Sequence, residues 1–73
     1  MANSIYSDEY KKTTEKLREA RIEAGFTQEQ VAEKLGKPQS YVSKSESGER
    51  RLDVTELKKF AELYFKDIKY FLE

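Results

Sequence analysis

The sequence predicts an all-α fold made of five short helices in one small domain. Three glycines and a single proline divide the 73 residues into helix-sized intervals. Within these intervals, apolar residues recur at the i, i+3, i+4 spacing of a helix face, and no alternating run is long enough for a strand. The core will be thin, because a domain of about 60 residues buries only roughly 60% of its unfolded surface.

The first predicted helix covers residues 7–24, with Ser7 as its N-cap and Gly25 as its left-handed stop. Its first half has a weak apolar face. We therefore expect residues 1–16 to form an N-terminal extension of this helix, and residues 17–73 to form the body of the single domain. The inward face is expected to carry Tyr10, Thr14, Leu17, Ala20, Arg21 and Ala24.

The second and third predicted helices are joined by a very short link. The second runs from Thr27 to Leu35 and opens with a capping box, because Gln30 follows Thr27 at the third position. The third begins near Pro38, which suits a first-turn position, and ends before Gly48. Two linking residues are too few for antiparallel packing, so the helices meet at a steep angle, as in a helix-turn-helix.

Two more helices complete the predicted fold. The fourth starts at Asp53, where Glu56 completes another capping box, and the fifth starts near Asp67. The residues expected to face inward are Val54, Leu57, Phe60, Ala61 and Tyr64 in the fourth helix, and Ile68, Phe71 and Leu72 in the fifth.

Composition argues against several classes of protein. Without His or Cys, the chain has no disulfides, no thiolate or imidazole metal ligands and no histidine acid or base. Its carboxylates alternate with Lys and Arg as on a solvated surface, so we expect no enzyme, no metal and no cofactor. No apolar run approaches the roughly 18 residues of a membrane span, and the N-terminus lacks a signal peptide pattern. These features predict a cytoplasmic, nucleoid-associated protein without a membrane partner.

The helix-turn-helix region resembles a known family. The segments TQEQVAEKLG (27–36) and KPQSYVSKSESG (37–48), with Arg21 and Gly25 upstream, are similar to the XRE family of lambda-repressor-like and Cro-like DNA-binding domains. The pattern combines TQxxVA, the LG turn and SxVSxxExG. The resemblance extends over residues 17–72 and implies that residues 17–73 are a DNA-binding domain.

The resemblance implies a sequence-specific transcriptional regulator, such as a repressor, that binds double-stranded DNA. Its recognition helix, about residues 38–47, would lie in the major groove, and a homodimer would bind palindromic half-sites about 34 Å apart. By position, the base-reading residues are Gln39, Ser40, Lys44 and Tyr41. Gln pairs with adenine, Lys donates to guanine and Ser serves either role. The alternative for Gln39, Ser40 and Lys44 is that they are ordinary solvated residues of an exposed helix. Tyr41 could contact a thymine methyl or a phosphate, or it could simply cover the edge of the core.

The resemblance also implies contacts to the DNA backbone. The phosphate-binding candidates are Gln28, Thr27, Lys37, Ser43, Arg50 and Arg51. Thr27 and Gln28 lie at a helix N-terminus, where free N–H groups attract anions, although both could serve only as caps. For the two arginines the competing account is a surface charge pair.

Three further predictions concern structure or assembly. Family resemblance implies a partly buried salt bridge between Arg21 and Glu46. Ser45 departs from the family, which usually has a bulky apolar residue there, so we expect Ser45→Ile to raise the melting temperature unless Phe26 or Phe60 already fills the space. We interpret Phe65 and Tyr70 as a dimer contact, with core packing as the alternative.

The alternative function is a protein-protein interaction module of the same fold, which binds an antitoxin or anti-repressor type of partner while DNA binding is secondary. The distribution of charge along the chain favours DNA binding over this alternative. The net charge is zero, yet residues 34–51 contain five cations against two carboxylates. This basic surplus falls on the turn, the recognition helix and the following loop, as a DNA-facing edge requires.

Overall fold

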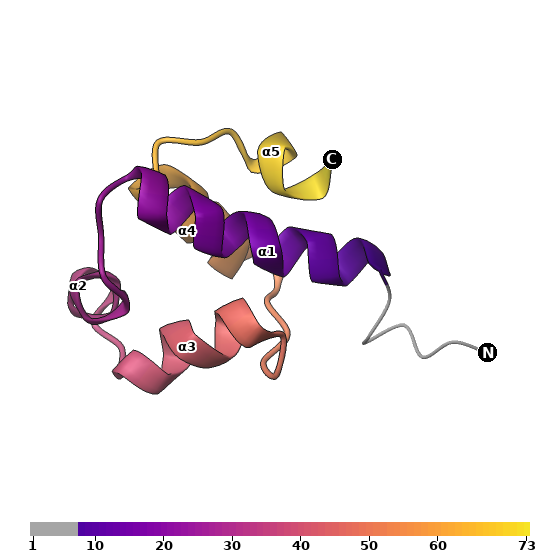
Figure 1. Cartoon of the computed structure of the whole chain (residues 1–73). Helices are drawn as coiled ribbons and strands as arrows, with labels where there is room; N and C mark the ends of the chain where they lie inside the picture. Colours follow the sequence, from indigo (N-terminus) through magenta and orange to yellow (C-terminus); the bar gives the residue numbers. More distant parts are fainter. Residues whose placement is uncertain (1–7) are drawn as a thin grey trace.

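The computed structural model describes residues 8–73 and contains five helices in this range (Figure 1). They are α1 (Asp8–Glu23), α2 (Gln28–Leu35), α3 (Gln39–Ser47), α4 (Val54–Leu63) and α5 (Ile68–Leu72). The described part has no strand, so the all-α prediction is confirmed. Ser7, the expected N-cap of the first helix, lies outside the described residues.

Capping boxes determine where α2 and α4 begin. The Thr27 hydroxyl accepts from the Gln30 N–H at 3.1 Å, and the Gln30 side chain accepts from the Thr27 N–H at 2.9 Å. Asp53 and Glu56 form the same reciprocal pair, which confirms both predicted capping boxes. Pro38 is the N-cap of α3 in an extended conformation rather than a residue of its first turn.

The C-terminal end of α4 differs from the ends of the other long helices. Left-handed glycines, Gly25 and Gly36, follow α1 and α2, whereas the left-handed residue after α4 is Phe65, with a φ of 61°. The Lys66 N–H donates to the Ala61 carbonyl at 2.9 Å, and the Phe65 N–H donates to the Glu62 carbonyl at 3.3 Å. These two bonds form a Schellman motif, in which glycine is the usual residue at the left-handed position.

The core is formed mainly by α1, α2 and α4 and is closed by one residue each from α3 and α5. Its fully enclosed side chains include Leu17, Val31, Val42, Phe60 and Phe71.

Two inward assignments in the sequence analysis were wrong. Val54 is 67% exposed and Leu72 is 63% exposed. Val54 is the first residue of α4, before the buried row that starts at Leu57, and Leu72 follows Phe71 in a helix too short to bury both.

The helices are arranged in tiers, with α5 on one side of α1 and α4, and α3 on the other, while α2 closes one end (Figure 1). The weak apolar face of residues 1–16 predicts an extension, but the described half of that segment is docked. The Thr13 hydroxyl donates to the Phe71 carbonyl at 2.8 Å, and the Lys16 ammonium donates to the Tyr70 carbonyl at 3.0 Å. Hydrogen bonds thus attach the first half of α1 to α5 where apolar contacts are few.

Candidate nucleic-acid interface

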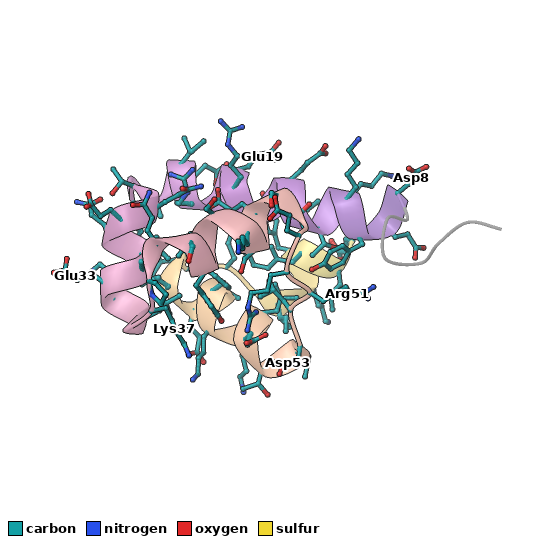
Figure 2. All side chains as sticks on the ribbon, turned by 90° about the horizontal axis from the view of Figure 1, so that it is seen from below. Asp8, Glu19, Glu33, Lys37, Arg51 and Asp53 are labelled. Carbon is teal, nitrogen blue, oxygen red and sulfur yellow. The ribbon has the colours of Figure 1, made fainter. Side chains whose placement is uncertain are left out.

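One face of α3 is open to solvent over its whole length. Gln39, Ser40, Ser43 and Lys44 are exposed, whereas Val42, Ser45 and Glu46 of the same helix are buried. The view onto α3 places Lys37 and Arg51 toward its opposite ends (Figure 2). The structure thus brings the predicted base-reading polar side chains onto one surface, between two exposed cations.

A polar cluster fixes α3 against α1 and α2. The expected ion pair is present: Arg21 Nε donates to Glu46 Oε2 at 2.6 Å, and Arg21 Nη2 donates to Glu46 Oε1 at 3.3 Å. The side chains are only 12% and 4% exposed, respectively. Arg21 Nη1 also donates to the Phe26 carbonyl at 2.9 Å. These bonds hold the orientation of α3 relative to α1 and the α1–α2 turn.

Gln28 joins this cluster, which the sequence did not indicate. Its side-chain amide donates to Glu46 Oε1 at 3.0 Å, although the two residues are 18 positions apart. The amide nitrogen has two hydrogens, so this bond leaves one donor for a phosphate. The neighbouring Thr27 hydroxyl oxygen accepts in the capping box and keeps its O–H as a donor, and the other free donors at this end are first-turn amides of α2.

Tyr41 covers the edge of the core. Its ring stacks on Phe60 with centroids 6.1 Å apart, and the Arg50 guanidinium lies 4.3 Å from the ring centroid. The Lys37 ammonium lies 5.4 Å from the same centroid. Burial and the Glu56 carboxylate raise the pKa of the Tyr41 hydroxyl, so it is a neutral group at physiological pH. The Phe60 and Arg50 contacts engage the Tyr41 ring at the core edge, which is the packing alternative predicted for this residue.

The two arginines after Gly48 have different surroundings. Arg50 forms a two-pronged pair with Glu56, with N–O distances of 3.1 and 2.6 Å. Arg50, together with the Asp53 backbone N–H, lowers the pKa of Glu56 to about 2. Arg51 is exposed and has no carboxylate partner in the described part of the chain. The charge pair that competed with phosphate binding thus exists for Arg50, while Arg51 is the more available cation.

The core behind α3 contains two polar groups with contrasting environments. Ser45 is fully buried, and its hydroxyl donates to the Tyr41 carbonyl at 2.6 Å. The Tyr64 hydroxyl is buried and has no hydrogen-bond partner among the described residues. Burial, and secondarily the Glu46 carboxylate, raise the pKa of Tyr64. Aromatic rings connect this region, because Tyr64 packs on Phe60 and Phe26 with centroids 5.9 and 6.4 Å apart.

The two predicted dimer residues differ in availability. Phe65 is 84% exposed. Tyr70 is only partly exposed, packs edge-on against Phe71 at 5.0 Å, and has the Lys16 and Lys66 ammonium groups 5.3 and 4.6 Å from its ring centroid. Phe65 is thus the better placed of the two for contact with another molecule.

The steep α2–α3 pair, the open face of α3 and the flanking cations define a helix-turn-helix fold of the DNA-binding regulator type. The family model described as Helix-turn-helix matches residues 17–71. A solved structure of an XRE-family like protein from Pseudomonas syringae pv. tomato str. DC3000 is 43% identical, with a TM-score of 0.83, and the match covers 94% of this chain and 84% of that one. The chain belongs to the XRE family of helix-turn-helix proteins.

Other comparisons and searches add three findings. No curated protein matches the sequence. Among residues 8–73, no helix is both long and apolar enough to cross a bilayer. The same residues contain no group of three or more acidic side chains placed to hold a metal ion.

Proposed function

We propose that this protein is a transcriptional regulator that binds double-stranded DNA sequence-specifically, as a homodimer on palindromic operators, with α3 in the major groove. The observation that carries the proposal is the exposed polar face of α3, which is held rigidly from behind by the Arg21–Glu46–Gln28 cluster. A rigid helix with free Gln, Ser and Lys side chains suits direct readout of base edges. Gln39, Ser40 and Lys44 are the proposed readers.

The geometry narrows the set of phosphate-binding cations. Of the predicted phosphate-binding cations, Arg50 is paired with Glu56. Lys37 and Arg51 remain exposed. Two such contacts in each chain of a dimer predict that log K falls with log[salt] with a slope of about −4. Gln28, Ser43 and the α2 N-terminus would add neutral hydrogen bonds that contribute little to this slope.

The deciding experiment is selection of duplexes from a randomised pool, followed by affinity measurements over a salt series. We expect a palindromic site, and Gln39→Ala should relax preference at one base position in each half-site, by about 1–3 kcal/mol. Lys44→Ala should likewise weaken binding of the selected duplex. Lys69→Ala is its matched control and should leave binding unchanged, because Lys69 is exposed on α5, which lies on the side of the molecule away from α3 (Figure 1). Failure to enrich any duplex, or a salt slope near zero, would favour the protein-interaction alternative.

Dimerisation is tested separately through Phe65. A phenylalanine that is 84% exposed in a left-handed backbone conformation is costly in an isolated chain, which supports a role in association. We expect Phe65→Ser to shift sedimentation toward monomer. Val54→Ser removes an apolar side chain that is 67% exposed at the other end of α4, and it should leave the oligomeric state unchanged.

A further inference from the structure

The loop at residues 49–53, between α3 and α4, is anchored at both ends. The Arg50 N–H donates to the Lys44 carbonyl at 3.1 Å, which ties the loop to α3. The Asp53 N–H donates to Glu56 Oε1 at 3.0 Å, which ties the other end of the loop to α4. Arg51 lies between these anchors, and its exposed side chain is one of the two exposed cations proposed to bind phosphate. The backbone on either side of Arg51 therefore determines where that charge is presented.

Tyr10 of α1 bonds to both backbone groups that flank Arg51. Its hydroxyl donates to the Arg50 carbonyl at 3.1 Å and accepts from the Leu52 N–H at 3.2 Å. A phenol can donate and accept at the same time, whereas phenylalanine can do neither. One side chain from a distant part of the sequence thus fixes the loop around a single residue.

The ring of Tyr10 also contacts the side chain of Arg51. The guanidinium lies 4.6 Å from the ring centroid, within the range of a cation–π interaction. Stacking on a ring restricts the rotamers of the long arginine side chain and leaves its edge free to donate. Tyr10 therefore acts on both the backbone and the charged group of Arg51.

We infer that Tyr10, which precedes the residues matched by the family model, is a positioning residue for DNA binding: its hydroxyl holds the loop at residues 49–53 so that Arg51 meets the DNA backbone. This inference rests on the proposed function. It adds a determinant of affinity in α1, on the segment that the sequence analysis treats as an extension.

Thr13 provides a matched control. It lies one turn from Tyr10 on α1, and its hydroxyl donates to the Phe71 carbonyl at 2.8 Å, so this hydroxyl docks α1 on α5 rather than on the loop. Tyr10→Phe and Thr13→Val each remove a hydroxyl that attaches α1 to the rest of the fold. Only Tyr10→Phe removes the contact with the loop.

The test measures binding of the selected duplex to the full chain and to both variants, at a temperature where all three are folded. We expect Tyr10→Phe, which loses the bonds to the Arg50 carbonyl and the Leu52 N–H, to weaken binding by about three- to tenfold, as the loss of one or two hydrogen bonds typically does. For this variant, the slope of log K against log[salt] should be smaller in magnitude by about 0.9 for each phosphate contact of Arg51 that is lost. Thr13→Val should match the wild type in both quantities. In an Arg51→Ala background, Tyr10→Phe should cause no further loss.

Hydrogen exchange of the Leu52 amide gives a readout that needs no DNA. Exchange should be faster in Tyr10→Phe than in the wild type or in Thr13→Val, because the acceptor for this N–H is removed. If the wild type binds the duplex tightly and Tyr10→Phe binds it with the same affinity, the role of Tyr10 is wrong while the proposed function stands. The same holds if Tyr10→Phe and Thr13→Val lose equal amounts of affinity. A wild type that binds no duplex would instead overturn the proposed function, and with it the DNA-binding role of Tyr10.

Discussion

Replacing Arg21 with methionine removes the cation that pairs with Glu46 while keeping a long apolar side chain. The Glu46 carboxylate is 4% exposed and would retain the Gln28 amide, 3.0 Å away, as its remaining donor among the bonds described. The Phe26 carbonyl would also lose its bond to Arg21 Nη1. The variant thus leaves a buried negative charge without its counter-ion.

Breaking a buried ion pair from one side costs about 3–5 kcal/mol. Arg21→Met should fall in the upper half of this range. Glu46→Leu should fall in the lower half, because Arg21 is 12% exposed and still donates to Phe26. A chain of this length has a total stability of about 4–11 kcal/mol, so either change removes a large share of it.

The assay is thermal unfolding followed by circular dichroism, with a double variant as control. At roughly 4–8 °C per kcal/mol, each single variant should melt at least about 12 °C below the wild type. Arg21→Met combined with Glu46→Leu should recover much of the loss, since replacing both partners by apolar groups is often close to neutral. Single variants that melt within about 2 °C of the wild type, or a double variant whose losses simply add, would refute the reasoning.

Substitutions at three other positions test the core and the α3–α4 loop. Ser45→Ile should lower the melting temperature and cost about 1–3 kcal/mol of stability, because the site is fully enclosed. Ser45→Ala should leave stability nearly unchanged. An isoleucine variant that melts above the wild type would support the expectation drawn from the sequence. Tyr64→Phe should raise stability by about 1 kcal/mol, since it removes a buried hydroxyl that has no hydrogen-bond partner among the described residues. A lower melting temperature in thermal denaturation would show that this hydroxyl is hydrogen-bonded in the wild type. Glu56→Gln keeps an acceptor for the capping box but loses the pair with Arg50. Because the folded pKa of Glu56 is about 2 against an ordinary value of 4.5, the ionised carboxylate stabilises the fold above pH 4.5, and this contribution disappears as the pH falls toward 2. The difference in melting temperature between wild type and Glu56→Gln should therefore shrink over that interval, and a constant difference would contradict the assigned pair.

Signals confined to one or two helical turns predicted most of the fold. Thr27 with Gln30 and Asp53 with Glu56 mark helix starts because each pair satisfies free backbone donors locally. Glycine marks helix ends because left-handed backbone is inexpensive there. Residue type does not mark the end of α4 in this way, because Phe65 is left-handed through the Schellman hydrogen bonds and phenylalanine itself does not favour a positive φ.

Contacts between distant residues account for what the sequence left open. The spacing of apolar residues could not show that Val54 lies beyond the packed part of α4. Nothing local connects Gln28 to Glu46, or Tyr10 to the loop 40 residues later. The sequence predicted the ion pair of the loop only in part. A surface charge pair was expected for either Arg50 or Arg51, but only the fold shows that Glu56 pairs with Arg50.

The left-handed Phe65 has a consequence for how folding and assembly are related. Glycine at this position would relieve backbone strain in the isolated chain, by about 1 kcal/mol or more, and would also remove the exposed ring. Under the proposed dimer, a substitution that makes the monomer more stable therefore weakens the complex. Screening variants of this chain for heat resistance alone would then favour proteins that fold better and associate less.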